Sequence, residues 1–262
     1  MKRLRMVLVL ACASLFFTIG SAVAQETNYD EYRSFVSSTA MTMEHGQFEV
    51  GIFAPLRYGL TDKLELSSHP LWFLVAPNLR AKYAFYRAGA VQLSWNSGLT
   101  YPTPLLRLLS MEGAGGVHPP DRAVPHIISL FNELVVTGVV EGHLVTGALG
   151  LQVAPRFGES QMVSIDVPVV YARTAAFFTV ATAVARVEVQ GPIVGPIGYR
   201  SGLKGFIYPG ADGRFTIEGT GQLRWQSSPR WLVQAGYLAS YGEYPFGGDF
   251  RILPTLDVLW AW

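Results

Sequence analysis

The chain has 262 residues, of which 50% are hydrophobic and 15% are charged, and its formal net charge is +1. The charged share lies well below the roughly 25% typical of soluble globular domains. This composition excludes intrinsic disorder, which needs low hydrophobicity and high charge. It also excludes a nucleic-acid-binding protein, because no basic run follows the first few residues.

Residues 1–24 have the pattern of a secretory signal peptide. Lys2, Arg3 and Arg5 precede an apolar stretch over residues 6–20, and Ala22-Val23-Ala24 forms a small-residue cleavage pattern before Gln25. Cleavage there would remove the only cysteine, Cys12, so we expect an exported chain without disulfides or thiolate metal ligands. We expect residues 25–46 to form a periplasmic segment or an extra strand.

From residue 47 onward, apolar and polar residues alternate with the period of β-strands. Over residues 214–226, Ile217, Leu223 and Trp225 share one face, and Thr216, Glu218 and other polar residues share the opposite face. Past the signal we find no run of about 18 apolar residues that would predict a membrane helix. Strands of about 9–11 residues, apolar outward and polar inward, are typical of transmembrane barrels. A soluble β-sandwich alternates in the same way, but its strands usually run shorter.

We therefore predict an all-β fold: a transmembrane antiparallel up-and-down β-barrel over residues 47–262, with about 12 strands and 10–14 possible. An even number is typical of bacterial barrels. The predicted strands are 47–58, 63–76, 79–87, 90–101, 126–140, 143–154, 162–173, 176–190, 196–208, 213–226, 231–242 and 249–262.

The longest predicted loop covers residues 102–125. Thr103 can cap a helix, Pro104 suits its first position, and Gly113 can end it. This segment is expected either to fold into the barrel as a constriction, to lie at the membrane interface, or to cover the rim. Because the loop follows the fourth predicted strand, it would lie at the same end as the N-terminus, where short turns are expected.

The chain has five histidines that are candidate catalytic residues: His45, His69, His118, His126 and His143. None has a recognisable spacing to a serine, and no two lie at metal-ligand spacing with a carboxylate. We therefore expect no enzymatic activity, no metal and no cofactor, and we interpret these histidines as turn and interface residues.

The last strand carries the most specific pattern. Phe250, Ile252, Pro254, Leu256, Val258, Trp260 and Trp262 alternate with Arg251, Thr255 and Asp257, and the chain ends on an aromatic residue. Pro254 removes a ladder donor and predicts a bulge or a late strand start. The ending resembles the assembly signal of Gram-negative outer-membrane β-barrel proteins, with Leu256, Val258, Trp260 and Trp262 as the signal residues. The resemblance implies an outer-membrane location, contact with outer-membrane lipid, and barrel-assembly machinery and periplasmic chaperones as partners during biogenesis.

Charged residues on the polar faces are expected to line the lumen, because charge facing lipid costs roughly 2–4 kcal/mol at the membrane midplane. These candidates are Glu49, Arg57, Lys63, Glu65, Arg80, Lys82, Glu133, Asp166, Arg186, Glu188, Arg200, Lys204, Arg214, Glu218, Arg224, Arg251 and Asp257. Their mixed signs suit a narrow aqueous path with a slight anion preference, or a lumen plugged by ion pairs. The leading functional hypothesis is a passive pore for small solutes. A non-conducting scaffold or surface-interaction barrel is the alternative, and a lipid-modifying outer-membrane enzyme is the third.

Overall fold

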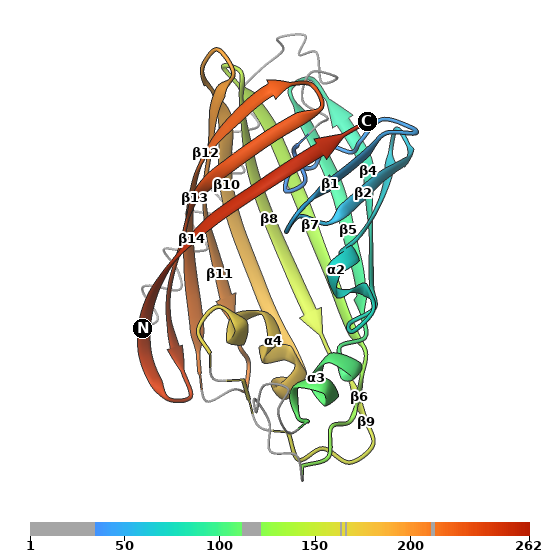
Figure 1. Ribbon diagram of the computed structural model, residues 1–262, viewed down its shortest axis with the longest axis vertical. Coiled ribbons are helices and arrows are strands. Elements are labelled where there is room, and N and C mark those ends of the chain that lie inside the picture. Colours follow the sequence, from blue (N-terminus) through green and yellow to red (C-terminus); the bar gives the residue numbers. More distant parts are fainter. Residues whose placement is uncertain (1–34, 112–121, 163, 166, 211–212) are drawn as a thin grey trace.

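The computed structural model describes residues 35–111, 122–162, 164–165, 167–210 and 213–262. The predicted signal peptide and residues 25–34 lie outside the described residues, as does His118. The described chain forms a tall barrel with short helices gathered toward one end (Figure 1).

Twelve strands close into one antiparallel barrel in which neighbours in the chain are neighbours in the sheet. This confirms the predicted fold class and strand number. Beside the barrel, β6 (His126–Ile127) and β9 (Arg156–Phe157) form a small two-stranded sheet. The barrel strands are β1 (Phe48–Gly51), β2 (Leu56–Thr61), β3 (Leu64–Ser68), β4 (Asn78–Ala88), β5 (Val91–Thr100), β7 (Ser129–Val140), β8 (His143–Val153), β10 (Ala181–Val194), β11 (Ile197–Ile207), β12 (Phe215–Ser228), β13 (Trp231–Tyr244) and β14 (Gly247–Ala261).

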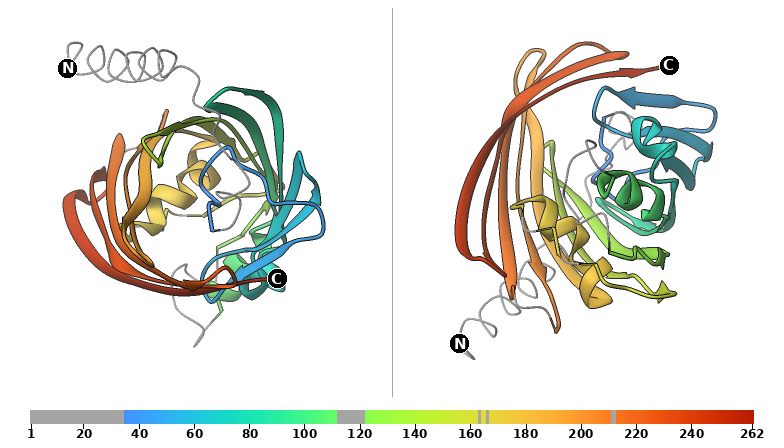
Figure 2. Two further views of the ribbon diagram at one scale, coloured as in Figure 1. Left: turned by 90° about the horizontal axis from the view of Figure 1, so that it is seen from above. Right: turned by 60° about the horizontal axis from the view of Figure 1, so that its bottom comes forward.

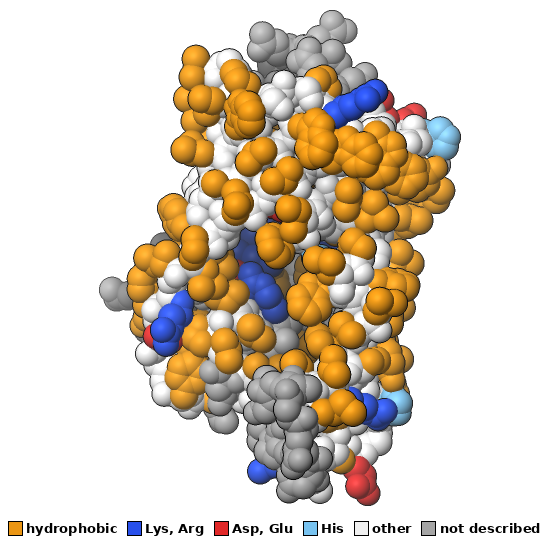
Figure 3. Space-filling view, in the orientation of Figure 1, with side chains coloured by type: hydrophobic (Ala, Val, Ile, Leu, Met, Phe, Trp, Pro, Cys, Tyr) orange, Lys and Arg blue, Asp and Glu red, His pale blue; other side chains and the backbone are white. Residues whose placement is uncertain are grey.

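The alternation seen in the sequence decides which side of the wall each residue occupies. On β12, Thr216 and Glu218 are buried inside the barrel, whereas Leu223 and Trp225 are exposed on its outside. The outer surface is therefore dominated by hydrophobic side chains, as Figure 3 shows for one face. Hydrophobic side chains on the outside and polar ones on the inside are the arrangement of a barrel in lipid.

The two ends of the barrel differ. At the end where β14 finishes, which we call the short-turn end, neighbouring strands are joined by tight turns over residues 62–63, 89–90, 141–142, 195–196 and 229–230. Glu141 and Gly142, with φ of +50° and +79°, form one of these two-residue hairpins. The opposite end, which we call the helical end, carries the longer connections with α2 (Pro70–Phe73), α3 (Thr103–Leu109) and α4 (Val170–Thr179).

Two errors in the strand prediction offset each other, so the predicted number of barrel strands is still correct. Residues 47–58 form two strands rather than one, because the chain turns between Gly51 and Leu56, where Phe53 N donates to Asp257 Oδ1 at 3.1 Å. The described residues of the predicted strand 162–173 form no strand, and α4 occupies its end and the start of the next predicted strand. Because of the extra early strand, the long connection lies at the helical end, away from the C-terminus. The long loop therefore does not lie at the end where short turns are expected.

The wrong strand prediction at α4 has a local cause. Val167, Val169 and Tyr171 alternate as a strand would, but Ala172, Ala175 and Ala176 follow at helical spacing and are buried on one face. A helix does form where the sequence predicted one in the long loop, and Pro104 lies in its first turn. The predicted cap was wrong, because Pro102 holds the N-cap position and the Thr103 hydroxyl donates to Pro125 O instead. Leu106 of α3 packs in a cluster with Ile127, Ala176 and Phe177, so this helix covers the rim at the helical end.

Candidate functional site

Most of the predicted lumen residues point into the barrel, as the strand registers require. These inward residues are Glu49, Arg57, Glu65, Arg80, Lys82, Glu133, Arg186, Glu188, Arg200, Lys204, Glu218, Arg224, Arg251 and Asp257. Lys63 lies instead in the turn between β2 and β3, and Arg214 precedes β12 and pairs with Glu243 at 3.8 Å. Asp166 lies outside the described residues.

Near the short-turn end, one buried arginine links three strands. The Arg57 guanidinium donates to Glu49 Oε1 at 2.8 Å and to both oxygens of Glu65, at 2.7 and 2.9 Å. Lys82 Nζ lies 3.5 Å from Glu65 Oε1. All four side chains are buried, so this charge row ties β1, β2, β3 and β4 together without exposing charge to the outside.

Residues 35–43 run across the lumen at this end, inside the ring of strands (Figure 2, left). Their backbone is held by lumen side chains: Glu49 accepts from Phe35 N at 2.7 Å, Glu65 accepts from Met43 N at 3.2 Å, and Lys82 donates to Met41 O at 3.1 Å. We call residues 35–43 the N-terminal plug. The sequence predicted a periplasmic segment or an extra strand here, and alternation could not reveal a segment that crosses the lumen.

The plug also packs apolar side chains against opposite walls. Phe35 clusters with Leu232 of β13 and Leu259 of β14. Met41 clusters with Val139 of β7 and Leu144 of β8. These contacts reach from one side of the barrel to the other, so the plug narrows the lumen at the short-turn end.

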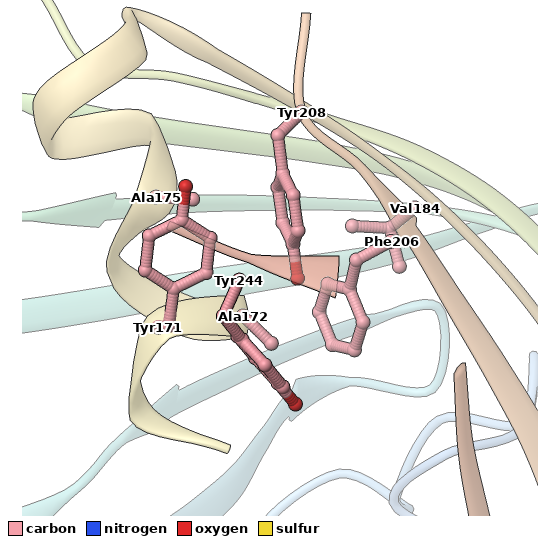
Figure 4. Close-up of a cluster of buried hydrophobic side chains, with 7 residues drawn as sticks. All are labelled: Tyr171, Ala172, Ala175, Val184, Phe206, Tyr208 and Tyr244. Carbon is pink, nitrogen blue, oxygen red and sulfur yellow. The ribbon is translucent and has the colours of Figure 1, made fainter. Parts of the chain in front are cut away.

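At the helical end, α4 folds into the barrel and packs against its inner wall (Figure 2, left; Figure 4). Tyr171 meets the rings of Tyr208 and Tyr244 edge-on, with centroids 5.2 and 5.8 Å apart. Arg173 on the same helix makes a bidentate pair with Glu218 of β12, at 2.6 and 2.9 Å. Arg173 was missed as a lumen residue because its segment was predicted to form strands.

Between the N-terminal plug and α4 lies a mid-lumen group of charges, which we call the cation chamber: Arg80, Glu133, Arg173, Arg186, Lys204 and Glu218. Arg186 Nε donates to Glu133 at 2.9 Å across β8, where Ala148 and Gly150 leave room for both long side chains. Lys204 is the direct cross-strand neighbour of both Arg186 and Glu218. Four cations and two carboxylates give the chamber a formal excess of positive charge.

Two cations of the chamber make neither an ion pair nor a hydrogen bond within the described part of the chain: Arg80 and Lys204. Arg80 lies over the ring of Phe131, 5.5 Å from its centroid, and Lys204 Nζ lies 4.7 Å from the ring centroid of Phe206. Arg80 is exposed and Lys204 half-buried although both point inward, so the chamber is accessible to water. These side chains can therefore offer hydrogen-bond donors to an anion in the lumen.

The described histidines form hydrogen bonds with groups other than a serine hydroxyl. His126 Nδ1 lies 2.5 Å from the Tyr101 hydroxyl, and His143 Nδ1 lies 3.3 Å from that of Tyr199. His45 and His69 bond backbone carbonyls. Within the described residues, no cluster of His, Cys, Asp and Glu could hold a metal ion, and no helix is long and apolar enough to cross a membrane.

No protein-family model and no curated protein matches this chain. Solved structures that resemble it include OmpT of Vibrio cholerae, described as outer-membrane expressed (9% identity, TM-score 0.47), and OprD (13%, 0.41) and OccK11, or OpdR (11%, 0.38), of Pseudomonas aeruginosa. The matches cover 91%, 86% and 82% of this chain and 75%, 63% and 57% of those chains. The chain thus spans less than two thirds of the two Pseudomonas structures. At this level of similarity nothing about function follows, and the fold assignment rests on the strand register.

Proposed function

We propose that this chain is an outer-membrane β-barrel protein that forms a channel for small anionic solutes. The outer-membrane location is supported by the apolar outer face of the barrel, together with the export signal and the terminal aromatic strand of the sequence. Short turns are typical of the periplasmic end of such barrels, so the short-turn end would face the periplasm and the helical end the outside.

The observation that carries the proposal is a pair of chamber cations, Arg80 and Lys204, that have no carboxylate partner among the described residues. A barrel serving only as a scaffold gains nothing from lumen cations without carboxylate partners. Arg80 lies near the cation Arg186 as well as near Glu133. Lys204 lies near Arg173 and Arg186 as well as near Glu218 and Glu133, so each of the two is repelled by a neighbouring cation. A solute anion passing through the chamber would offset that repulsion, which is the way rings of Arg and Lys select anions in pores.

The N-terminal plug makes the channel a regulated one in this proposal. Hydrogen bonds to the side chains of Glu49, Glu65 and Lys82 hold its backbone. These bonds join the plug to the wall and not one strand to another, so withdrawal of the plug would leave the barrel wall intact. The resting protein should therefore conduct rarely. Removal of the plug should open a path to the cation chamber.

Planar-bilayer recordings test this proposal. The wild type should give rare and brief steps, whereas a variant lacking residues 37–43 should give long-lived steps. The heat-dependent gel shift of a folded barrel is measured on both proteins, so that a loss of folding is told apart from a loss of conductance. A deletion variant that folds but gives no ion steps would contradict the channel and support the scaffold, the alternative hypothesis.

A further inference from the structure

The barrel is closed by a short seam between β14 and β1. β14 pairs with β13 along its whole length, from Gly247 to Trp260. With β1 it pairs only through Leu259, Trp260 and Ala261, extended by the bonds of Trp262 and Val258. Within the described residues, no strand pairs with the other edge of β14 from Gly247 to Asp257. An open strand edge inside the hydrocarbon of a membrane is costly, because its backbone groups have no water to bond.

The hydrogen-bonding alternation shows which residues face this open edge. Ala261 N donates to Arg230 O on the β13 side, and Trp262 N donates to Phe48 O on the β1 side. Even-numbered residues of β14 therefore direct their backbone N–H and C=O groups toward β1. Because the register between β13 and β14 has no shift, the same holds for the even-numbered residues earlier in the strand. Residues 250, 252, 254 and 256 face the open edge.

Local chemistry removes two of the four backbone donors on this edge, those at positions 250 and 254. Phe250 N donates to Asp249 Oδ1 at 2.8 Å, and just beyond the open edge Val258 N donates to Asp257 Oδ1 at 2.9 Å. Pro254 has no N–H at all, and the bulge or late strand start predicted from it is absent, because a proline on an unpaired edge breaks no ladder. Proline and charged side chains are the means by which proteins keep a strand edge unpaired. The opening beside β14 is thus a built feature of the fold.

The wall is hollowed beside β14, and Arg80, which points inward from β4, is exposed. In Figure 3, Lys and Arg side chains are visible at mid-height in a hollow of the wall, with hydrophobic side chains on both sides. Figure 1, in the same orientation, has β14 to the left of this position and α2 to the right. Leu253 points toward the lumen from β14 and is still 43% exposed, as expected beside a missing neighbour.

The border of the opening is strongly apolar. Ile52 and Phe53 in the connection before β2 are exposed, and so are Leu71, Trp72, Phe73 and Leu74 in and after α2. His69 Nε2 lies 2.7 Å from Phe53 O and links the two segments. A molecule in this opening would meet hydrocarbon-like side chains at its outer end and unpaired cations at its inner end.

We infer that the opening beside β14 admits a single-chain anionic amphiphile, such as a fatty acid, whose headgroup binds Arg80 and Lys204 while its alkyl chain remains in the opening. This inference rests on the proposed channel function and names its substrate class. Arg186 adds a further donor, because its Nη1 has no acceptor within the described residues. The charged headgroup would lie against the cations of the chamber, and the alkyl chain would lie against the apolar border of the opening.

Binding of radiolabelled laurate to the refolded mature protein in nanodiscs tests the headgroup site, with empty nanodiscs subtracted. Wild type should bind laurate saturably, and the double variant Arg80→Gln, Lys204→Gln should weaken binding about tenfold or more, since two charge-assisted contacts are lost. Arg230→Gln, in an exposed turn between β12 and β13, is the matched control and should bind as wild type does. Equal binding by the double variant would overturn the inference.

Chain length separates this inference from the proposed channel. Butyrate carries the same headgroup without a long tail and should bind far more weakly than laurate. If butyrate binds equally well and still depends on Arg80 and Lys204, the opening plays no part and the inference fails, although the anion channel stands. If laurate binds in the predicted way in both experiments but the barrel lacking residues 37–43 gives no ion steps, the channel proposal is contradicted. The protein would then be a barrel that binds an amphiphile.

The lateral path has its own measurement. The only cysteine, Cys12, precedes Gln25, so a mature chain accepts a single engineered thiol. A bimane label on Leu253→Cys should be quenched by brominated phospholipid chains. Thr220→Cys is the control, because Thr220 lies at the same level of the inner wall, two strands away through Leu238. Equal quenching at the two positions would mean that lipid does not reach the opening.

Discussion

Replacement of Arg57 by methionine should destabilise the barrel more than any other single charge removal in the lumen. Arg57 is 1% exposed and lies between two buried carboxylates, donating to Glu49 at 2.8 Å and to Glu65 at 2.7 and 2.9 Å. Methionine fills much of the volume but removes the ion-pair partner of Glu49 and leaves Glu65 paired with Lys82 alone, at 3.5 Å. Breaking a buried pair by removing one partner costs about 3–5 kcal/mol.

Arg251→Met is the matched comparison. Arg251 donates to Asp249 at 2.8 Å, but its side chain is 62% exposed, so the loss should be about 0–1 kcal/mol after solvent screening. Adding Glu49→Gln to Arg57→Met should recover part of the loss, because one carboxylate then remains for Lys82. Urea unfolding in detergent micelles, followed by tryptophan fluorescence, measures all three free energies of unfolding. An Arg57→Met barrel within about 1 kcal/mol of wild type would refute the reasoning, since that is the ordinary size of a point-mutation effect.

Three further predictions concern the wall, the seam and α4. Leu223→Arg should impair folding into lipid vesicles far more than Gln222→Arg, by roughly 2–4 kcal/mol, because Leu223 is exposed on the outer face and Gln222 faces the lumen; equal folding yields would contradict the assigned facing. Deletion of Trp260 to Trp262 removes most of the seam with β1 and should leave a protease-sensitive, unclosed chain, so a retained heat-dependent gel shift would refute closure by this strand. Arg173→Ala breaks the bidentate pair with Glu218 and should speed amide hydrogen exchange in α4 while β10 stays protected; unchanged exchange would mean that ring packing alone holds the helix.

The sequence predicted the parts of the fold that alternation controls. The long strands from β11 to β14 are close to their predicted bounds, because each has one face in lipid-like surroundings and one face in the lumen. The short strands β1 and β2 were not separated, since the alternation of residues 47–58 continues through the turn. What breaks the strand is the side chain of Asp257, more than two hundred positions later, which accepts from Phe53 N.

The contents of the lumen could not be predicted from periodicity. The N-terminal plug has no regular pattern, and its path is determined by Glu49, Glu65 and Lys82 on the wall. Similarly, α4 follows a segment that alternates like a strand, and it is helical because Ala172 and Ala175 fit against Val184 and Phe206 inside the barrel. Such interactions depend on positions that meet only after the barrel closes.

The ion selectivity of the barrel lacking residues 37–43 tests the central claim most directly. The chamber holds four cations and two carboxylates, so the reversal potential in a KCl gradient should show that chloride crosses more readily than potassium. Replacing Arg80 and Lys204 by glutamate should reverse the sign of that potential. A potential that favours potassium in the parent protein, or one that the double replacement leaves unchanged, would contradict the account.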